Sequence, residues 1–289
     1  MWRLLRETLG QLSEFGKWRP AAVFSMGGYV AGPPVLAALL RGVPVVVMEP
    51  NAVPGATNRW MGRWVKRALI SFEETARFFP SGKSELTGLP VREEFFNLPP
   101  RPEGAEFTVL VTGGSQGSRT LNEAARQSWP LFKKSGLPVR FIHQSGLPMF
   151  DALQKEFAAT GLEGEISAFL TDMPAAFAQA DLIVCRAGAG AVSELAAAGK
   201  PSVLVPFPFA ADDHQLKNAQ AFERVGAAEL SLDREWTGQK FFDVVSRLSV
   251  ERAQLAKMAE SARRLARRGA AARAAEILID SVSGNRNNS

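Results

Sequence analysis

This chain of 289 residues has little cysteine and little histidine, and it contains no long apolar run. Its single cysteine, Cys185, excludes an intramolecular disulfide and fits a reducing compartment. Because Cys185 lies in the apolar run LIVC, we expect a buried core thiol rather than a nucleophile. No stretch reaches the ~20 consecutive apolar residues that a membrane-spanning helix needs. These absences argue against a disulfide-stabilised domain and against an integral membrane segment.

A strong nucleic-acid signature is also missing, although the net charge is +5 and the isoelectric point is near 9.6. The basic residues are dispersed, apart from one cluster over 263–268, and no recognised nucleic-acid motif accompanies them. We therefore expect no nucleic-acid partner. An anionic membrane surface or a pyrophosphate-containing substrate explains the charge at least as well.

Two glycine-rich loops are the most informative features that are present. The first, VLVTGGSQGSRTLNEA, carries Gly113 and Gly114, and the second, LIVCRAGAGAVSELAAAGKP, carries Gly188 and Gly190. Each pattern predicts a strand, a tight loop and a helix N-terminus, which directs backbone N–H groups towards an anion. Two such loops in one half of the chain favour a nucleotide held at the carboxyl ends of a parallel sheet.

Neither loop matches a standard phosphate-binding fingerprint. The segment 113–119 lacks both the GxxxxGK[ST] pattern and the G-x-G-x-x-G spacing, but Ser115 before a helix suits close ligand approach. Glu194 has two open interpretations. It either stabilises a helix N-terminus, by ~0.3–1 kcal/mol, or accepts hydrogen bonds from both ribose hydroxyls of a nucleotide.

A third polar segment, FPFAADDHQLKNA, follows the next expected strand. His214 and Gln215 could hold a polyhydroxylated sugar, whereas Asp212 or Asp213 could simply cap a helix. His214 lacks the neighbouring Cys, His or carboxylate spacing of a zinc site, so we expect no metal. His143, after the apolar run RFI, is more consistent with a structural role than with catalysis.

The alternation of apolar runs and helical patterns predicts an α/β protein with two Rossmann-like parallel-sheet domains facing a cleft. In the first half only about two strands are evident, and the chain opens on a helix, so we expect an incomplete N-terminal domain. The expected divisions are an N-terminal domain over 1–98, a linker over 99–105, a nucleotide-sugar domain over 106–250, C-terminal helices over 251–283 that could pack back toward the N-terminal domain, and a disordered tail over 284–289.

Seven motifs together resemble one family. RPAAVFSMGGYVAGP, EPNAVPGATN, TGLPVR, TGGSQGS, HQSG, CRAGAGAVSELAAAGKP and DDHQLKNA occur in the order found in the MurG family of bacterial peptidoglycan glycosyltransferases (family 28, GT-B fold). The resemblance implies inverting transfer of N-acetylglucosamine from UDP-N-acetylglucosamine to the C4 hydroxyl of N-acetylmuramic acid in undecaprenyl-pyrophosphoryl-N-acetylmuramoyl-pentapeptide (lipid I to lipid II). It also implies no cofactor, and a peripheral position on the anionic cytoplasmic face of the inner membrane.

The resemblance further implies roles for individual residues. Arg92 and Ser115 should contact the phosphate or nucleotide portion of the donor, and the backbone of Leu170 should contact the uracil. The ribose and diphosphate should lie along Ala189, Gly190, Ala191, Val192, Ser193 and Glu194. The sugar should contact Asn51, Gln215 and His214. The acceptor pyrophosphate should contact Gly27, Gly28 and Tyr29. A membrane-facing patch should include Trp2, Arg3, Leu4, Leu5 and Arg6.

The chain also departs from the family pattern. The family's first strand and its GGTGGHxxP-type loop do not occur, so Met1 resembles an internal methionine, and Leu89 replaces the asparagine of TGNPVR. The family's candidate base, a histidine in that loop, is therefore absent, and the catalytic residue is unknown, with Glu49 as a weak candidate. Two alternatives stay open: a UDP-sugar-binding fragment that does not transfer, and a related GT-B glycolipid glycosyltransferase.

Overall fold

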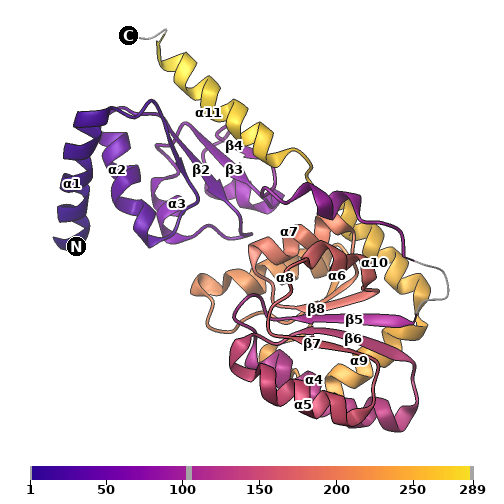
Figure 1. Ribbon diagram of the computed structural model, residues 1–289. Helices are drawn as coiled ribbons and strands as arrows, with labels where there is room; N and C mark the ends of the chain where they lie inside the picture. Colours follow the sequence, from indigo (N-terminus) through magenta and orange to yellow (C-terminus); the bar gives the residue numbers. More distant parts are fainter. Residues whose placement is uncertain (1, 102–105, 287–289) are drawn as a thin grey trace. The chain divides into compact units, whose positions relative to one another are not determined.

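The computed structural model describes residues 2–101 and 106–286, and the side chains of 6–101 and 106–283 (Figure 1). Contacts divide the chain into two units. The N-terminal unit contains the residues up to Val91 and those from Arg267 onward, and the C-terminal unit runs from Arg92 to Ala266. Each unit has its own parallel sheet and its own apolar core.

The N-terminal unit has a four-stranded sheet in the order β1-β2-β3-β4, with every pair parallel. The strands are β1 Val23–Ser25, β2 Val45–Glu49, β3 Arg67–Ile70 and β4 Ser84–Leu86. The helices are α1 Trp2–Trp18, η1 Tyr29–Ala31, α2 Gly32–Leu40, α3 Ala56–Met61, η2 Glu73–Phe78 and α11 Ala270–Arg286. Ala274 and Ile277 of α11 pack on the sheet residues Val46, Met48 and Leu69.

The expectation of about two strands before the linker was wrong for this unit. β3 and β4 were missed because the run RALI is short and β4 is a three-residue strand of half-buried side chains. Such segments lack the long Val/Ile/Leu run or the clean alternation that identifies a strand in sequence. The four strands are parallel, as expected for an α/β unit.

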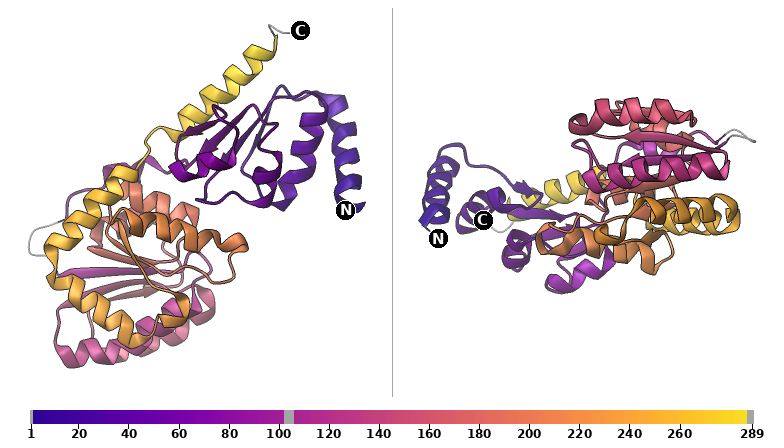
Figure 2. Two further views of the ribbon diagram at one scale, coloured as in Figure 1. Left: turned by 180° about the vertical axis from the view of Figure 1, so that it is seen from behind. Right: turned by 90° about the horizontal axis from the view of Figure 1, so that it is seen from below.

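The C-terminal unit has a six-stranded parallel sheet in the order β10-β9-β8-β5-β6-β7. Figure 2 shows it between two layers of helices, with α4, α5 and α9 on one face and α6, α7, α8 and α10 on the other. The strands are β5 Phe107–Thr112, β6 Val139–Gln144, β7 Gly164–Ser167, β8 Leu182–Cys185, β9 Ser202–Leu204 and β10 Ala228–Leu230. The α-helices are α4 Arg119–Ser135, α5 Phe150–Thr160, α6 Met173–Gln179, α7 Ala189–Ala198, α8 His214–Arg224, α9 Gly238–Val250 and α10 Arg252–Leu265. The 3₁₀ turns are η3 Glu93–Asn97, η4 Leu147–Met149, η5 Ala211–Asp213 and η6 Asp233–Glu235.

The strands of this unit confirm the expected alternation: the central strands β5, β8 and β9 are buried throughout, whereas the edge strands β7 and β10 are partly exposed. In β5 all six residues are buried, as the continuous run FTVLVT predicts for a central parallel strand. The register places Thr112 of β5 between Gln144 of β6 and Cys185 of β8. The carboxyl ends of three strands therefore meet at one edge, where the loops that follow them form the site.

The boundaries between units differ from the ranges expected from sequence. The contacts change at Val91 and Arg92, so the expected linker over 99–105, of which 102–105 lie outside the described residues, falls within the C-terminal unit. The C-terminal helices are divided between the two units, since α10 packs on α7 of the C-terminal unit and α11 packs on β2 of the N-terminal unit. The tail expected over 284–289 is helical as far as Arg286, and residues 287–289 lie outside the described part.

Candidate active site

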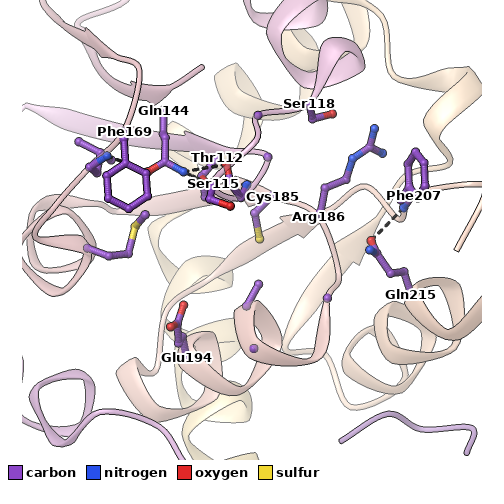
Figure 3. Close-up of a pocket in the computed structure, with 18 of the residues that line it drawn as sticks. Thr112, Ser115, Ser118, Gln144, Phe169, Cys185, Arg186, Glu194, Phe207 and Gln215 are labelled. Atoms are coloured by element: carbon purple, nitrogen blue, oxygen red, sulfur yellow. Dashed lines mark hydrogen bonds between the residues drawn. The ribbon is translucent and has the colours of Figure 1, made fainter. Parts of the chain in front are cut away.

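A pocket of about 820 Å³ opens at the carboxyl ends of the strands of the C-terminal unit. In Figure 3, Gln144 and Phe169 lie at one end of this space, whereas Arg186, Phe207 and Gln215 lie at the other. The residues that line it come from the carboxyl ends of the strands and from the loops and helices that follow them, with Arg92 after β4 and Asp233 after β10. They are Arg92, Thr112, Gly113, Gly114, Ser115, Gly117, Ser118, Arg119, Thr120, Gln144, Phe169, Leu170, Thr171, Met173, Phe177, Cys185, Arg186, Gly188, Gly190, Ala191, Glu194, Phe207, Pro208, Phe209, Gln215 and Asp233.

The first glycine-rich loop is shaped by contacts within the protein. A Cβ atom on Gly113 would collide with the backbone of Gly117 and Ser118, and one on Gly117 would collide with the carbonyl of Ser145. Gly117 also has a positive φ of 75°, which side chains rarely adopt. Ser118 caps α4 by accepting a hydrogen bond from the Leu121 N–H at 3.4 Å. The loop thus holds a helix N-terminus at the pocket wall.

The second glycine-rich loop is open towards the pocket. A Cβ atom on Gly188 or on Gly190 would meet no protein atom within 4 Å, and neither residue has a positive φ. The packing of the protein therefore does not require glycine at either position. Gly188 is the N-cap of α7 without a side-chain cap, and the first intrahelical bond runs from Val192 N–H to Gly188 O at 3.0 Å. The backbone N–H groups of α7 that come before Val192 are therefore available to an anion.

Glu194 lies in the second turn of α7 and lines the same pocket. Burial raises the pKa of this carboxyl group above its usual value, and the nearby guanidinium of Arg92 opposes the shift. Burial, with a smaller contribution from Glu194, also raises the pKa of the Cys185 thiol to about 12. Cys185 is buried in β8 and is protonated at neutral pH, as the sequence analysis expected for a core thiol.

Gln144 is a site residue that sequence reasoning missed. Its side chain is 1% exposed at the end of β6, and it donates hydrogen bonds to Thr112 Oγ1 at 3.2 Å and to Gly114 O at 2.9 Å. Its Oε1 accepts a hydrogen bond from the Leu170 N–H at 2.8 Å. One buried amide therefore connects the loop after β5 with the loop after β7.

Arg186 was also missed, although it directly follows the strand that ends in Cys185. Its Nη1 donates to Val205 O at 3.0 Å, to Pro206 O at 3.1 Å and to the carboxylate of Asp233. Asp233 in turn accepts a hydrogen bond from Thr120 Oγ1 at 3.1 Å. This network fixes a guanidinium beside the pocket, where it can stabilise negative charge.

The Phe207–Gln215 segment forms the wall of the pocket opposite Gln144. Gln215 Oε1 accepts a hydrogen bond from the Phe207 N–H at 3.0 Å, and the rings of Phe207 and Phe209 meet edge to face at 5.6 Å. Phe209 is 84% exposed at the pocket wall. The alternative interpretation, in which the side chain of Asp212 or Asp213 caps a helix, is wrong. Asp213 occupies the N-cap with φ of 53° and makes no side-chain cap bond, and Asp212 has φ of 52°.

His143 serves the framework behind the pocket. The ring is fully buried, and burial lowers its pKa to about 4, so the imidazole is neutral near pH 7. Its Nε2 lies 2.9 Å from Asn122 Oδ1, and Asn122 Nδ2 donates to Ser145 O at 2.8 Å. These bonds tie the first turns of α4 to the end of β6, which agrees with the structural role expected from sequence.

In the N-terminal unit, Glu49 organises its own loop. The carboxylate is 2% exposed and accepts hydrogen bonds from the N–H groups of Asn51 and Gly55, both at 3.1 Å, and from the Asn58 side chain at 2.9 Å. Burial nevertheless raises its pKa. Because both oxygens are already occupied by its own loop, the arrangement favours a structural role over the general-base role considered from sequence.

The structure brings seven of the residues expected to contact the donor into one pocket: Arg92, Ser115, Leu170, Gly190, Ala191, Glu194 and Gln215. Ala189, Val192, Ser193 and His214 do not line it, and Val192 is buried in the core. His214 Nδ1 instead lies 2.7 Å from Ala211 O. Gly27, Gly28, Tyr29 and Asn51 belong to the other unit, and the side chains of residues 2–5 lie outside the described part.

Two kinds of feature are absent from the part of the chain that the structure describes. Among the residues with defined positions, no group of three or more His, Cys, Asp or Glu side chains could hold a metal ion. Within the same residues, none of the helices combines the length and the apolar character needed to cross a membrane.

Two family models match the chain. Residues 108–276 match the glycosyltransferase family 28 C-terminal domain, and residues 1–70 match the glycosyltransferase family 28 N-terminal domain. The first match covers most of the C-terminal unit, including both glycine-rich loops.

Curated relatives carry one common name, UDP-N-acetylglucosamine--N-acetylmuramyl-(pentapeptide) pyrophosphoryl-undecaprenol N-acetylglucosamine transferase. The protein from Solibacter usitatus (strain Ellin6076) is 66% identical over 258 residues, which span 89% of this chain and 71% of the relative. The protein from Myxococcus xanthus (strain DK1622) is 39% identical over 264 residues, which span 91% of this chain and 69% of the relative.

A solved structure agrees with these relatives. The crystal structure of Acinetobacter baumannii MurG superposes with a TM-score of 0.84 at 33% sequence identity, covering 96% of this chain and 80% of that one. The architecture is thus the GT-B arrangement of two Rossmann-like parallel-sheet domains. On the strength of its sequence and its fold, the chain belongs to glycosyltransferase family 28 and, within it, to the MurG family.

Proposed function

We propose that this chain is a UDP-N-acetylglucosamine-dependent hexosyltransferase of peptidoglycan synthesis. The reaction transfers N-acetylglucosamine to the C4 hydroxyl of N-acetylmuramic acid in undecaprenyl-pyrophosphoryl-N-acetylmuramoyl-pentapeptide, with inversion at the anomeric carbon. The observation that carries the proposal is the open second glycine-rich loop. Gly188 and Gly190 leave an uncapped helix N-terminus facing space that no protein atom fills, and Glu194 lines the same pocket.

The donor diphosphate is assigned to the part of the pocket that both glycine-rich loops line. Hydrogen bonds and positive charge are supplied there by the backbone N–H groups of α7 that come before Val192, by the Ser115 hydroxyl and by the Arg92 guanidinium. Arg186 is a further cation on this wall, held by Asp233. Phosphate oxygens prefer such donors, and the guanidinium groups can bind them in a bidentate manner.

The rest of the donor is assigned from the same wall residues. Glu194 accepts hydrogen bonds from the ribose hydroxyls, and the backbone around Leu170 faces the uracil. At the opposite end in Figure 3, Gln215 contacts the hydroxyls of the sugar. The exposed ring of Phe209, which packs against Phe207, lines the same pocket. The nucleoside is thus assigned to one end of the pocket in Figure 3 and the sugar to the other.

The chemistry needs charge stabilisation on the leaving group. As the C4 hydroxyl attacks the anomeric carbon, the bond from that carbon to UDP breaks and a second negative charge develops on the β-phosphate. Helix N-termini and arginines fixed beforehand stabilise that charge without reorganising during the reaction. The residue that removes the proton of the attacking hydroxyl is not assigned, because Glu49 is held by its own loop.

The acceptor and the membrane are assigned to the N-terminal unit. Gly27, Gly28 and Tyr29 follow β1 and are assigned to the acceptor pyrophosphate; both glycines have a positive φ, and Tyr29 is exposed. Asn51, whose side chain donates to Glu49 Oε1 at 3.3 Å, is the residue of this unit assigned to the sugar. Exposed Trp60 and Trp64 supply the aromatic anchors that peripheral proteins use at a bilayer surface. The chain is proposed to bind the anionic cytoplasmic face of the inner membrane peripherally.

Two measurements on the purified chain test the proposal. Melting curves with UDP-N-acetylglucosamine and with UDP-glucose test the donor, since a ligand at ~100 times its dissociation constant stabilises by about 2.7 kcal/mol. Incubation with labelled donor and lipid I then tests transfer. Selective stabilisation with transfer supports the whole proposal. Selective stabilisation without transfer identifies a donor-binding fragment, and preference for UDP-glucose indicates a related glycolipid glycosyltransferase. No stabilisation by either sugar nucleotide would contradict the donor assignment.

A further inference from the structure

One buried side chain joins the loop assigned to the diphosphate with the loop assigned to the uracil. Gln144 Nε2 donates to Gly114 O at 2.9 Å and to Thr112 Oγ1 at 3.2 Å, in the loop after β5. Gln144 Oε1 accepts from the Leu170 N–H at 2.8 Å, in the loop after β7. The amide thus uses both of its N–H bonds and its oxygen within the protein.

The sheet order explains why a residue of β6 can make this connection. β6 lies between β5 and β7, and the register pairs Gln144 with Thr112 on one side and with Ser167 on the other. A long polar side chain at the last position of β6 therefore reaches both following loops. The two loops make no backbone pairing through their own strands, because β5 and β7 are not neighbours.

The partners also fix the orientation of the amide. Gly114 O is an acceptor and the Leu170 N–H is a donor, so exchange of the amide nitrogen and oxygen would break both bonds. Thr112 Oγ1 additionally accepts from the Gly114 N–H at 3.2 Å, which closes a ring of bonds within the loop. Because Gln144 is 1% exposed, this network is shielded from water and has little freedom to rearrange.

We propose that Gln144 is a positioning residue that couples the part of the pocket assigned to the uracil to the part assigned to the diphosphate. Because Gln144 fixes the position of the two loops relative to each other, the uridine and the diphosphate of one ligand can bind their loops simultaneously. The nucleoside, once bound, presents the diphosphate at a high effective concentration. Gln144 makes no direct contact in this role; it acts through Gly114 and Leu170. The inference rests on the proposed donor function.

The experiment compares a whole ligand with its two halves. UDP, uridine and inorganic pyrophosphate are titrated separately into the unsubstituted chain and into Gln144→Met, which keeps the length of the side chain without its hydrogen bonds. Thr108→Val is the matched control, because Thr108 is buried at the other end of β5 and its hydroxyl bonds to Glu106 O. Melting curves confirm that each variant is folded.

Loss of coupling has a specific signature. Gln144→Met should bind UDP about tenfold more weakly or worse, while its affinities for uridine and for pyrophosphate change less than about threefold. Thr108→Val should stay within about threefold for all three ligands. Equal losses for UDP and for either half would overturn the proposal, since they indicate a direct contact or general damage. Unchanged UDP affinity would overturn it as well.

A second variant covers the case in which Gln144→Met does not fold. Gln144→Glu keeps an oxygen for the Leu170 N–H but loses the N–H bond to Gly114 O. Weakened UDP binding with uridine binding unchanged supports coupling, and parallel loss of both contradicts it. If the unsubstituted chain binds no UDP, the proposed function and this inference fail together. If it binds UDP and the variants bind it equally well, only the inference fails.

Discussion

The side-chain oxygen of Gln215 accepts a hydrogen bond from the Phe207 N–H at 3.0 Å, so that α8 holds the start of the loop that follows β9. With its oxygen engaged, the amide nitrogen of Gln215 is the group left to meet a sugar hydroxyl at the pocket wall. In the proposed function, Gln215 therefore links the position of this loop to recognition of the sugar.

We predict that Gln215→Ala weakens binding of UDP-N-acetylglucosamine by about five- to tenfold, the effect of losing one hydrogen bond, and leaves UDP binding within about twofold. Calorimetric titration of both ligands measures the difference. Gln220→Ala on the same helix is the control, because Gln220 does not line the pocket. If the affinities for UDP and for the sugar nucleotide fell equally, Gln215 would stabilise the loop instead of contacting the sugar.

Gly190→Ala should separate stability from function. A Cβ atom at Gly190 meets no protein atom within 4 Å, and the residue lies in α7 without a positive φ. Alanine should therefore stabilise the folded chain by roughly 0.4–1 kcal/mol, because it reduces the freedom of the unfolded state. The same methyl group should obstruct the assigned diphosphate, so UDP affinity should fall.

Gly10→Ala is the matched control for that substitution, since Gly10 also lies within a helix and its added Cβ meets nothing within 4 Å. It should stabilise similarly and leave UDP affinity unchanged. Urea denaturation and UDP titration of both variants provide the comparison. A Gly190→Ala chain that gains stability and keeps full UDP affinity would contradict close approach of the phosphate to α7.

Glu194→Gln should weaken UDP binding by roughly 10- to 100-fold, since hydrogen bonds to a charged group contribute about 1.5–3 kcal/mol. The pH dependence gives a second test. Burial raises the pKa of Glu194, so the carboxylate becomes protonated at a higher pH than an exposed glutamate. UDP affinity of the unsubstituted chain should fall as the pH is lowered toward that raised pKa.

The glutamine variant has no proton to gain at this position and should lose that part of the pH dependence. Titrations of both chains at several pH values between 7 and 5 measure it, with the phosphate ionisation of UDP common to both. A pH dependence that is identical in the two chains would show that Glu194 does not bind the ribose as a carboxylate.

Much of the C-terminal unit could be predicted from sequence because its strands are continuous apolar runs. FTVLVT and LIVC form fully buried strands, and the glycine pattern after each one identifies the loops that line the pocket. Local sequence suffices where burial on both faces requires an uninterrupted run of Val, Ile and Leu.

The residues that sequence missed act through partners far away along the chain. Asp233 lies 47 residues after Arg186 and 113 residues after Thr120, yet it binds both. Gln144 similarly meets Gly114 and Leu170 on either side of it in the sequence. Such contacts depend on strand order, which single-sequence patterns do not provide. A polar residue ending a buried strand was the available signal.

The two histidines allow a direct test of burial. Burial lowers the pKa of His143 from 6.5 to about 4, because the charged ring would lose its hydration. Between these values the unfolded chain binds a proton that the folded chain does not, so stability should fall as the pH drops from 6.5 to 4. Imidazole resonances followed by NMR should show one ring unprotonated down to about pH 4, and His143→Gln identifies it. A His143 resonance that titrates near pH 6.5 would contradict the buried, neutral ring.

The N-terminal unit exposes two tryptophans that suit a membrane interface. Trp60 and Trp64 are 55% and 52% exposed, their rings lie 6.0 Å apart, and the guanidinium of Arg63 lies 4.9 Å from the Trp64 ring. Trp side chains bind at the level of the lipid headgroups, and each nearby Arg contributes about 1 kcal/mol on an anionic surface. We expect Trp60→Ala with Trp64→Ala to weaken binding to anionic vesicles while the chain stays folded.

Sedimentation with vesicles of anionic and of zwitterionic lipid, at low and at high salt, separates the contribution of the tryptophan rings from that of the arginine charge. The unsubstituted chain should prefer the anionic vesicles and should lose that preference at high salt, because salt screens the charge of Arg63 and its neighbours. The double variant should bind both vesicle types less. Leu147→Ser is the control, since Leu147 is an exposed apolar residue of the C-terminal unit. Equal loss in this control would show that exposed apolar area in general, rather than the tryptophan pair, drives the association.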